Sequence, residues 1–146
     1  MNGKRFFFVT LPLYNKETMK TKMIGLVAFI SSLLGCNAQN QGFTSLSVGD
    51  YAKAIEDTTI VRLDVRSAAE YAAGHIANAI NIDVLQDGFE TKAMQMLPKN
   101  KTVAVNCRSG KRSKRAAAIL VKRGYEVIEL DAGFNEWVNA GMPVTK

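Results

Sequence analysis

Two short apolar runs constrain the fold of this chain more than any other feature. They read TIVRLDV at residues 59–65 and TVAVN at residues 102–106. Continuous β-branched and apolar runs of this length are typical of strands that are buried on both faces of a sheet. Helical spacing lies between them, so the two strands are joined by crossovers. The alternation predicts an α/β fold with a largely parallel sheet of about five strands and helices on both faces.

The remaining elements follow from shorter signals. EVIEL at residues 126–130 alternates as a strand does, and residues 79–82 are a candidate for a short additional strand. Ser67 and Glu70 are spaced as a capping box at a helix start, and Asp87 and Glu90 repeat that spacing before a second helix. A third helix is predicted over residues 113–123. No internal repeat or low-complexity segment interrupts the pattern, so residues 43–146 form one domain.

The positive charge of the chain is concentrated in one loop. The formal net charge is +6, but the first 36 residues hold five Lys/Arg and one acid, which leaves 14 basic and 12 acidic residues after them. This near balance argues against nucleic-acid binding. Five of the 14 cations fall within NCRSGKRSKR at residues 106–115. An anionic partner is therefore expected at this loop.

The first 42 residues have the organisation of an export signal. Lys20 and Lys22 precede an uncharged, mostly apolar run at residues 23–35, which is too short to span a membrane but suits a signal peptide. The run ends in LLGC, which resembles the lipobox of bacterial lipoproteins, and a polar tether follows to residue 42. Residues 19–35 are thus predicted to be a lipoprotein signal peptide. Cys36 is the predicted lipidation site, anchoring the domain to a membrane of the bacterial cell envelope, in the periplasm or outside.

Residues 1–18 do not suit this signal. They place a second apolar patch, residues 6–9, ahead of the charged segment. We therefore expect translation to start at Met19, with residues 1–18 an overlong N-terminus. If Cys36 is acylated, Cys107 is the sole thiol of the mature chain, and an internal disulfide is excluded.

Cys107 sits where a strand ends and a helix begins, the position of binding crevices in open α/β sheets. The following RSGKR contains Gly110, so the backbone can turn its N–H groups inward around an anion. A cysteine in such a loop is expected to exist largely as thiolate. Lys114 and Arg115 are predicted in the first helical turn, where cations are disfavoured, so a compensating anion, whether thiolate or substrate, is expected there.

Three segments together resemble the rhodanese-family sulfurtransferases. CRSGKRS at residues 107–113 is similar to the family's active-site loop. RLDVRSAAEYAAGHIANAINI at residues 62–82 and GYEVIELDAGFNEWVNAGMPV at residues 124–144 are similar to its two other signatures. The resemblance covers nearly all of residues 43–146, in the family's order and spacing. It implies a single rhodanese-like domain with this active-site loop: Cys107, Arg108, Ser109, Gly110, Lys111, Arg112 and Ser113.

The resemblance implies sulfur transfer through covalent catalysis. Cys107 is expected to take the sulfane sulfur of an anionic donor such as thiosulfate as a persulfide, and to pass it to cyanide or a thiol, including a protein thiol. Arg108, Lys111 and Arg112 are expected to attract the donor. Asp64 and Arg66 are expected to brace the loop through charge-assisted hydrogen bonds or to form a plain surface ion pair. No metal or organic cofactor is implied.

Two other functions remain open at this stage. A cysteine phosphatase also uses a thiolate in an anion-binding loop, but its motif needs Arg at the position of Ser113, and Arg112 comes one residue too early. A non-catalytic role, in which the domain carries sulfur or binds a partner, is the alternative from another class. The sequence identifies neither the physiological donor nor the acceptor.

Four further residues are assigned structural roles. His75 is the only histidine in the chain, and its place in GHI favours a structural role over that of a general base. Trp137 is predicted to anchor the core. Met94 and Met96 are predicted to be ordinary helix and core residues.

Overall fold

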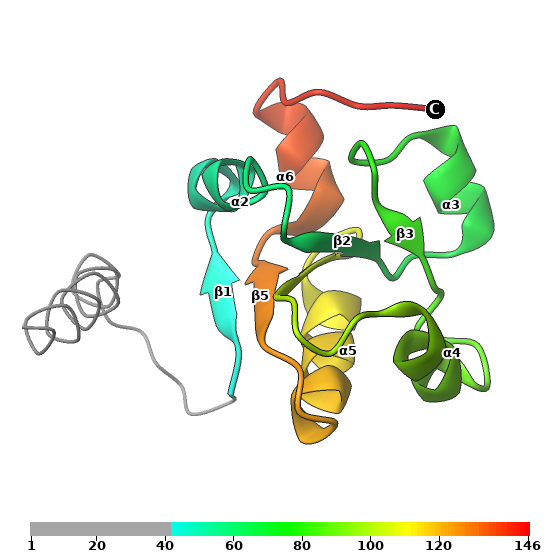
Figure 1. Cartoon of the computed structure of the whole chain (residues 1–146). Helices are drawn as coiled ribbons and strands as arrows, with labels where there is room; N and C mark the ends of the chain where they lie inside the picture. Colours follow the sequence, from blue (N-terminus) through cyan, green and yellow to red (C-terminus); the bar gives the residue numbers. More distant parts are fainter. Residues whose placement is uncertain (1–41) are drawn as a thin grey trace, which may run out of the picture. The chain divides into compact units, whose positions relative to one another are not determined.

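The strands form one five-stranded sheet in which every neighbouring pair is parallel. The structure is a computed structural model that describes residues 42–146 (Figure 1). The order across the sheet is β1-β5-β4-β2-β3. The strands are β1 (Thr44–Leu46), β2 (Val61–Asp64), β3 (Ile80–Asn81), β4 (Val103–Asn106) and β5 (Val127–Leu130). The two runs that constrain the fold most strongly become the adjacent strands β2 and β4, and the predicted parallel α/β sheet is confirmed.

Helices cover both faces of the sheet, as predicted. They are α2 (Val48–Ala54), α3 (Ala68–Ala73), α4 (Phe89–Met96), α5 (Lys111–Lys122) and α6 (Gly133–Asn139). Successive side chains of a strand point to opposite faces. In β4, Val103 and Val105 join the core beneath α4 and α5, whereas Ala104 joins the core beneath α2 and α6.

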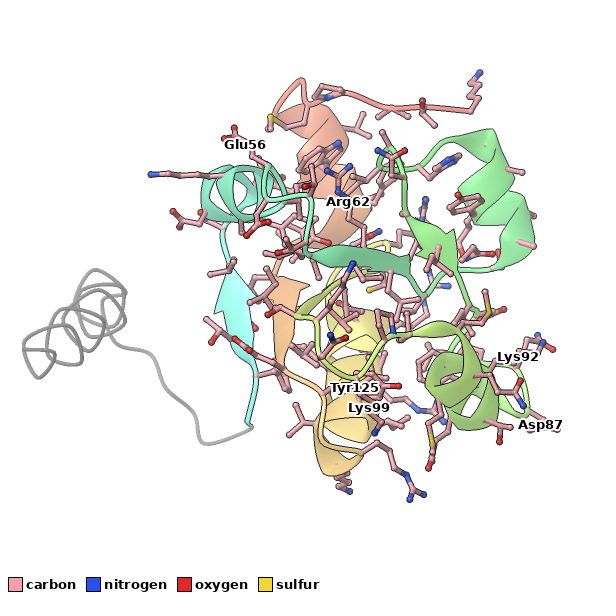
Figure 2. All side chains as sticks on the ribbon, viewed as in Figure 1. Glu56, Arg62, Asp87, Lys92, Lys99 and Tyr125 are labelled. Atoms are coloured by element: carbon pink, nitrogen blue, oxygen red, sulfur yellow. The ribbon has the colours of Figure 1, made fainter. Side chains whose placement is uncertain are left out.

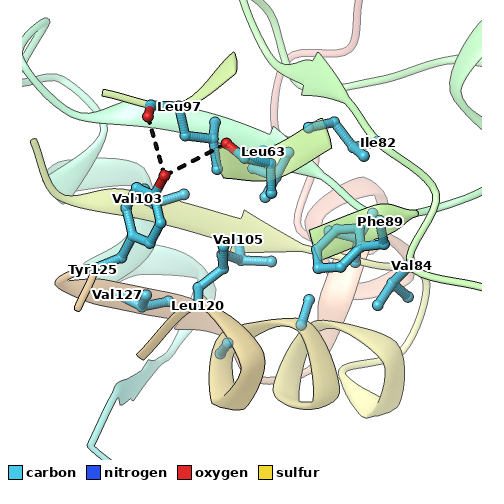
Figure 3. Packing of buried hydrophobic residues seen from close by; sticks show 14 of the residues in the cluster. Leu63, Ile82, Val84, Phe89, Leu97, Val103, Val105, Leu120, Tyr125 and Val127 are labelled. Carbon is cyan, nitrogen blue, oxygen red and sulfur yellow. Dashed lines mark hydrogen bonds between the residues drawn. The ribbon is translucent and has the colours of Figure 1, made fainter. Parts of the chain in front are cut away.

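The larger core lies between the sheet and the helices α4 and α5 (Figure 3). Leu63, Val105 and Leu120 are at most 1% exposed there. Tyr125 closes one end of this core, and its hydroxyl donates to the carbonyl of Leu97 at 3.1 Å. Lys99 lies over the Tyr125 ring, 4.3 Å from its centre, at the surface of the same end (Figure 2).

The register brings the carboxyl ends of the strands to one edge of the sheet. Asp64 of β2 pairs with Asn106 of β4, and Val105 pairs with Glu129 of β5. The segments that leave these three strands are therefore neighbours, although they lie far apart in the sequence. This is the edge at which α/β sheets place their sites, and Cys107 follows directly after β4.

Two helix starts differ from the sequence predictions. Ser67 and Glu70 do form a capping box, but α4 begins after Gly88, which has a left-handed backbone, and Asp87 does not cap it. Helix α5 begins at Lys111, two residues before the predicted start, because Gly110 turns the chain into it. Lys114, the fourth residue of the helix, therefore lies in its first turn as predicted, whereas Arg115 lies one residue beyond it.

The predictions for residues 1–41, including the signal peptide and lipidation at Cys36, lie outside the described residues. Within residues 42–146, no helix has the length and hydrophobicity needed to cross a membrane.

Candidate active site

The Cys107 sulfur is enclosed by its own loop. Only 1% of the residue is exposed. The Gly110 N–H donates to Sγ at 3.1 Å, and the Ser113 hydroxyl lies 3.4 Å from Sγ. Both groups can stabilise negative charge on the sulfur. The loop thus places hydrogen-bonding groups from the backbone and from a side chain around one buried thiol.

Gly110 is required by the shape of this turn. Its φ is +92°, a left-handed conformation that other residues adopt at a cost. A Cβ at this position would lie 1.9 Å from the Asp131 carbonyl oxygen, which belongs to the segment after β5. Any side chain here would push the loop away from β5 and move the N–H that points at the sulfur.

The start of α6 holds the other side of the loop. The Phe134 N–H donates to the Cys107 carbonyl at 2.7 Å, and the Asn135 N–H donates to the Arg108 carbonyl at 3.0 Å. Gly133 packs so closely that a Cβ there would lie 2.6 Å from the Arg108 carbonyl. Two free N–H groups at a helix N-terminus thus fix the backbone of the cysteine and its successor.

Arg112 is paired with an acid from α3. Its guanidinium makes two hydrogen bonds to the two Glu70 carboxylate oxygens, at 2.7 and 2.8 Å. Hydrogen bonding to Arg112 lowers the pKa of Glu70 to about 2, and the same bond raises the pKa of Arg112. Arg112 was expected to attract the donor, but its hydrogen-bonding edge is engaged by Glu70.

Lys114 is also neutralised by the protein. Its ammonium lies 2.6 Å from an Asp131 carboxylate oxygen and 3.5 Å from Glu129. Partial burial alone would lower the pKa of Lys114, but the hydrogen bond to Asp131 and the charges of both acids outweigh it, so the net pKa is raised. The anion that the sequence predicted beside Lys114 is therefore a carboxylate of this chain.

The other three loop cations have no acidic partner within residues 42–146. Arg108, Lys111 and Arg115 are exposed, and none lies within 4.0 Å of a described carboxylate. These three side chains remain available to an anion in solution. Arg108 follows Cys107 directly, and Lys111 and Arg115 come later in the same segment.

Glu129 lies beneath the loop and was missed by the sequence analysis. It belongs to β5, is fully buried, and faces α5. Ser113 Oγ lies 2.6 Å from one of its carboxylate oxygens, and Ser45 Oγ donates to the other at 2.7 Å. The signal available in the sequence was a carboxylate at an inward position of EVIEL, where an apolar residue is expected.

Asp64 and Arg66 do not act on the loop in the expected way. They form a buried ion pair with each other at 2.6 Å, and Arg66 also donates to the Gly74 carbonyl. Within the described chain, no hydrogen bond joins either side chain to the loop. Their link to it is indirect, because the Arg66 guanidinium lies 4.0 Å from the ring centre of Phe134, whose N–H holds the Cys107 carbonyl. The predicted ion pair between the two residues is therefore present, but it is buried rather than at the surface, and direct bracing of the loop does not occur.

The structural role of His75 agrees with its contacts. The His75 ring stacks on Tyr71 at 3.7 Å, and its Nδ1 lies 3.0 Å from the Tyr71 carbonyl. Trp137 is buried in the core beneath α2 and α6, as predicted. Met94 and Met96 are about half exposed, at 45% and 52%, so the prediction that they belong to the core was wrong.

Asn106 does not contribute to the thiol environment. Strand alternation turns its side chain to the face opposite Cys107. It is fully buried, and neither of its amide atoms has a hydrogen-bond partner within residues 42–146. Asn106 therefore lies on the face of the sheet opposite the one that Cys107 packs on.

Two cavities in the described chain are not lined by Cys107. One, of about 590 Å³, lies along the ends of β2 and β3 and is lined by residues that include Ser67, Asn81 and Lys92, but not Cys107. The other, of about 280 Å³, includes Arg62, whose guanidinium donates to the carbonyls of Ile55 and Ala77 (Figure 2). No group of three potential metal ligands occurs within residues 42–146.

Comparison with known proteins identifies the family. The model of the Rhodanese-like domain matches residues 47–140, which include the loop and all five helices of the described residues. The chain belongs to the rhodanese-like domain family. A sulfurtransferase of Allochromatium vinosum is 36% identical to this rhodanese-like chain over 90 residues, covering 61% of it and 79% of the relative. The thiosulfate sulfurtransferase GlpE of Pseudomonas fluorescens is 35% identical over 89 residues, covering 60% and 79%.

Structural comparison supports the same rhodanese-like fold. The crystal structure of a rhodanese-related protein from Thermoplasma volcanium aligns with a TM-score of 0.63 at 30% identity, covering 70% of this chain and 98% of that one. The family also includes other activities. A tRNA uridine(34) hydroxylase of Cronobacter sakazakii is 30% identical over 118 residues, but the chain spans only 33% of its length. Family membership therefore supports sulfurtransferase-type chemistry without fixing the substrate.

Proposed function

We propose that this domain transfers sulfane sulfur through a persulfide on Cys107. The observation that carries the proposal is the pair of groups around Sγ, the Gly110 N–H at 3.1 Å and the Ser113 hydroxyl at 3.4 Å, in a loop whose outer cations are unpaired within residues 42–146. A structural thiol needs neither feature. A nucleophile that carries negative charge before and after it accepts sulfur needs both.

The reaction has two half-reactions. In the first, the Cys107 thiolate attacks the outer sulfur of thiosulfate, a new S–S bond forms, and the S–S bond of thiosulfate breaks, so that sulfite leaves with the electron pair. In the second, an acceptor such as cyanide attacks the outer sulfur of the persulfide, thiocyanate leaves, and the thiolate is regenerated. The net redox change is confined to the donor and acceptor, and the enzyme needs no other electron carrier.

Exposed cations supply the attraction for a dianionic donor. Arg108, Lys111 and Arg115 fit this role, since Arg112 and Lys114 are paired with carboxylates of the domain. The same pairing disfavours a phosphatase. A phosphate would need an unengaged guanidinium in the loop to bind bidentately, and the carboxylate of Glu129 lies on the inner side of the loop, where it would repel a phosphate.

The deciding experiment is the mass of the intact protein before and after thiosulfate, followed by cyanide. We expect a gain of one sulfur atom on Cys107, which cyanide removes as thiocyanate. Cys107→Ser, which is nearly isosteric, should remain folded and gain nothing. If the wild-type protein gains no sulfur while its thiol still reacts with iodoacetamide, thiosulfate is not the donor or the domain has the non-catalytic binding role.

We further propose that the domain is held at the bacterial cell envelope by a lipid on Cys36. The support is the LLGC sequence after the apolar run, preceded by two lysines. Mass analysis of the protein from the native membrane fraction should find an acylated Cys36 as the N-terminal residue. An unmodified chain that retains peptides from residues 19–35 would contradict this.

A further inference from the structure

A short chain of polar contacts runs from the Cys107 sulfur to a buried carboxylate. Sγ lies 3.4 Å from Ser113 Oγ, and Oγ lies 2.6 Å from Oε1 of Glu129. Cys107, Ser113 and Glu129 are each at most 1% exposed. Because water is excluded, the three side chains must satisfy one another.

The single hydroxyl proton of Ser113 fixes the direction of these hydrogen bonds. A hydroxyl has one proton to donate, and Ser113 Oγ has three acceptors in reach: Sγ, the Gly110 carbonyl at 2.9 Å and Glu129 at 2.6 Å. The shortest of these contacts is to Glu129, the one acceptor that carries a full negative charge while Cys107 is still a thiol, which makes it the strongest. Ser113 therefore donates to Glu129, and a lone pair of Oγ is left to accept the S–H of the Cys107 thiol.

We propose that Glu129 accepts the thiol proton of Cys107 through Ser113 when the nucleophile forms. The S–H proton moves to Ser113 Oγ while the Ser113 proton moves to Oε1 of Glu129, and the electron pair of the broken S–H bond stays on sulfur. The proton returns by the same route when the thiol is restored. The proposal rests on the proposed function only in taking Cys107 as the nucleophile. Glu129 acts as a positioning residue through Ser113 and does not contact the substrate.

The charges around Glu129 are compatible with this role. Lys114 of α5 lies 3.5 Å away but is held more closely by Asp131, so it does not neutralise Glu129 fully. Ser45 of β1 hydrogen-bonds the second oxygen. Tyr51 of α2 stays neutral, because burial, followed by the charges of Asp64 and Glu129, raises its pKa.

The positive charge of Arg112 also interacts with Cys107. The charge of Cys107 contributes to the raised pKa of Arg112, after the larger effects of Glu70. A thiolate at Cys107 is therefore stabilised by the charge of Arg112, and the proton transferred to Glu129 removes a negative charge that would otherwise oppose it.

The test is the pH dependence of Cys107 alkylation by iodoacetamide in the full chain, in a Cys36→Ser background that leaves one thiol. Glu129→Gln keeps the size of the side chain but cannot take up the proton, and Ser113→Ala breaks the chain of contacts. We expect each to lower the alkylation rate constant at pH 7 by about tenfold or more, with equal rates for all variants near pH 10. Glu90→Gln, which removes a surface carboxylate that pairs with Arg123 and contacts neither Ser113 nor Lys114, is the matched control and should keep the wild-type profile.

An unchanged or faster rate at pH 7 in Glu129→Gln would overturn the proposal, because it would mean that the carboxylate only repels the thiolate. If Glu129→Gln does not fold, Ser113→Ala decides alone, and a wild-type profile in that variant overturns the proposal. Alkylation does not require sulfur transfer. If the wild-type protein forms no persulfide but the variants slow alkylation as expected, only the proposed function is refuted. If the wild-type protein forms the persulfide but the variants keep the wild-type alkylation profile, only the relay is refuted.

Discussion

The ion pair between Glu70 and Arg112 gives a stability prediction that can be worked from the structure. A pKa of about 2 in the folded protein, against the ordinary 4.5, corresponds to about 3 kcal/mol at neutral pH if the whole effect is retained. The two side chains are 29% and 22% exposed, and solvent-exposed pairs typically contribute 1 kcal/mol or less. We therefore expect Glu70→Gln to lower the free energy of unfolding by about 1–2 kcal/mol at pH 7.

Glutamine isolates the charge, because it also serves at the third position of a capping box. The Ser67 N–H and hydroxyl, which lie 3.1 and 3.0 Å from the Glu70 carboxylate, keep an acceptor. Since the pKa of Glu70 is lowered on folding, its contribution is complete above about pH 4.5 and is lost as the pH falls toward 2. The difference between wild type and Glu70→Gln should shrink to less than about half by pH 3.

Urea unfolding followed by circular dichroism at pH 7, 4 and 3 measures this difference. Glu90→Gln is the matched control, because Glu90 pairs with Arg123 on the surface, where the two side chains are 40% and 53% exposed. Glu90→Gln should lower the free energy of unfolding by about a few tenths of a kcal/mol at most. A Glu70→Gln difference that stays constant from pH 7 to pH 3, or one no larger than that of Glu90→Gln, would refute the reasoning.

Three further substitutions test other contacts. Gly110→Ala should lower the free energy of unfolding by about 2–4 kcal/mol and slow sulfur transfer, because a left-handed backbone and a clash with the Asp131 carbonyl both oppose it; an unchanged urea midpoint would argue against this. Asn106→Leu should raise the free energy of unfolding by about 1–3 kcal/mol, since it removes an unpaired buried amide, and a decrease would show that the amide has a partner. Tyr125→Phe should lower the free energy of unfolding, measured by thermal unfolding, by about 0.5–1.5 kcal/mol, because the hydrogen bond to the Leu97 carbonyl is lost. An unchanged free energy of unfolding would count against that hydrogen bond.

The central sheet could be predicted from the sequence because burial on both faces leaves a local signal. Strands β2 and β4 lie inside continuous apolar runs, and the predictions were correct to within two residues at each end. Strand β1 gave no such signal, because it has three residues and only Leu46 is buried. Its place at the sheet edge is decided by pairing with β5, a contact between segments more than 80 residues apart.

The loop that holds Cys107 could be predicted because its internal contacts are local in sequence. Its partners could not be predicted, because they lie far from it in the sequence. Cys107 and Gly110 are three residues apart, and the turn between them is a local property of the chain. Glu70 meets Arg112 across 42 positions, and Glu129 meets Ser113 across 16. Only the tertiary fold brings these acids to the loop, so the sequence showed the loop residues without the acids that contact them.

The division of these cations explains how one loop can hold positive charge and still be stable. Five like charges on a short segment would repel one another. Two of them are neutralised by carboxylates: Arg112 pairs with Glu70 of α3, and Lys114 pairs with Asp131 directly after β5. These pairs fix the loop to the elements beside it, while the unpaired cations are the exposed ones. The pairing therefore leaves attraction for an anion on the outer side of the loop. On the inner side lies Glu129, which is a carboxylate rather than a cation; under the two proposals, the thiol loses its proton inward while an anionic donor approaches from outside.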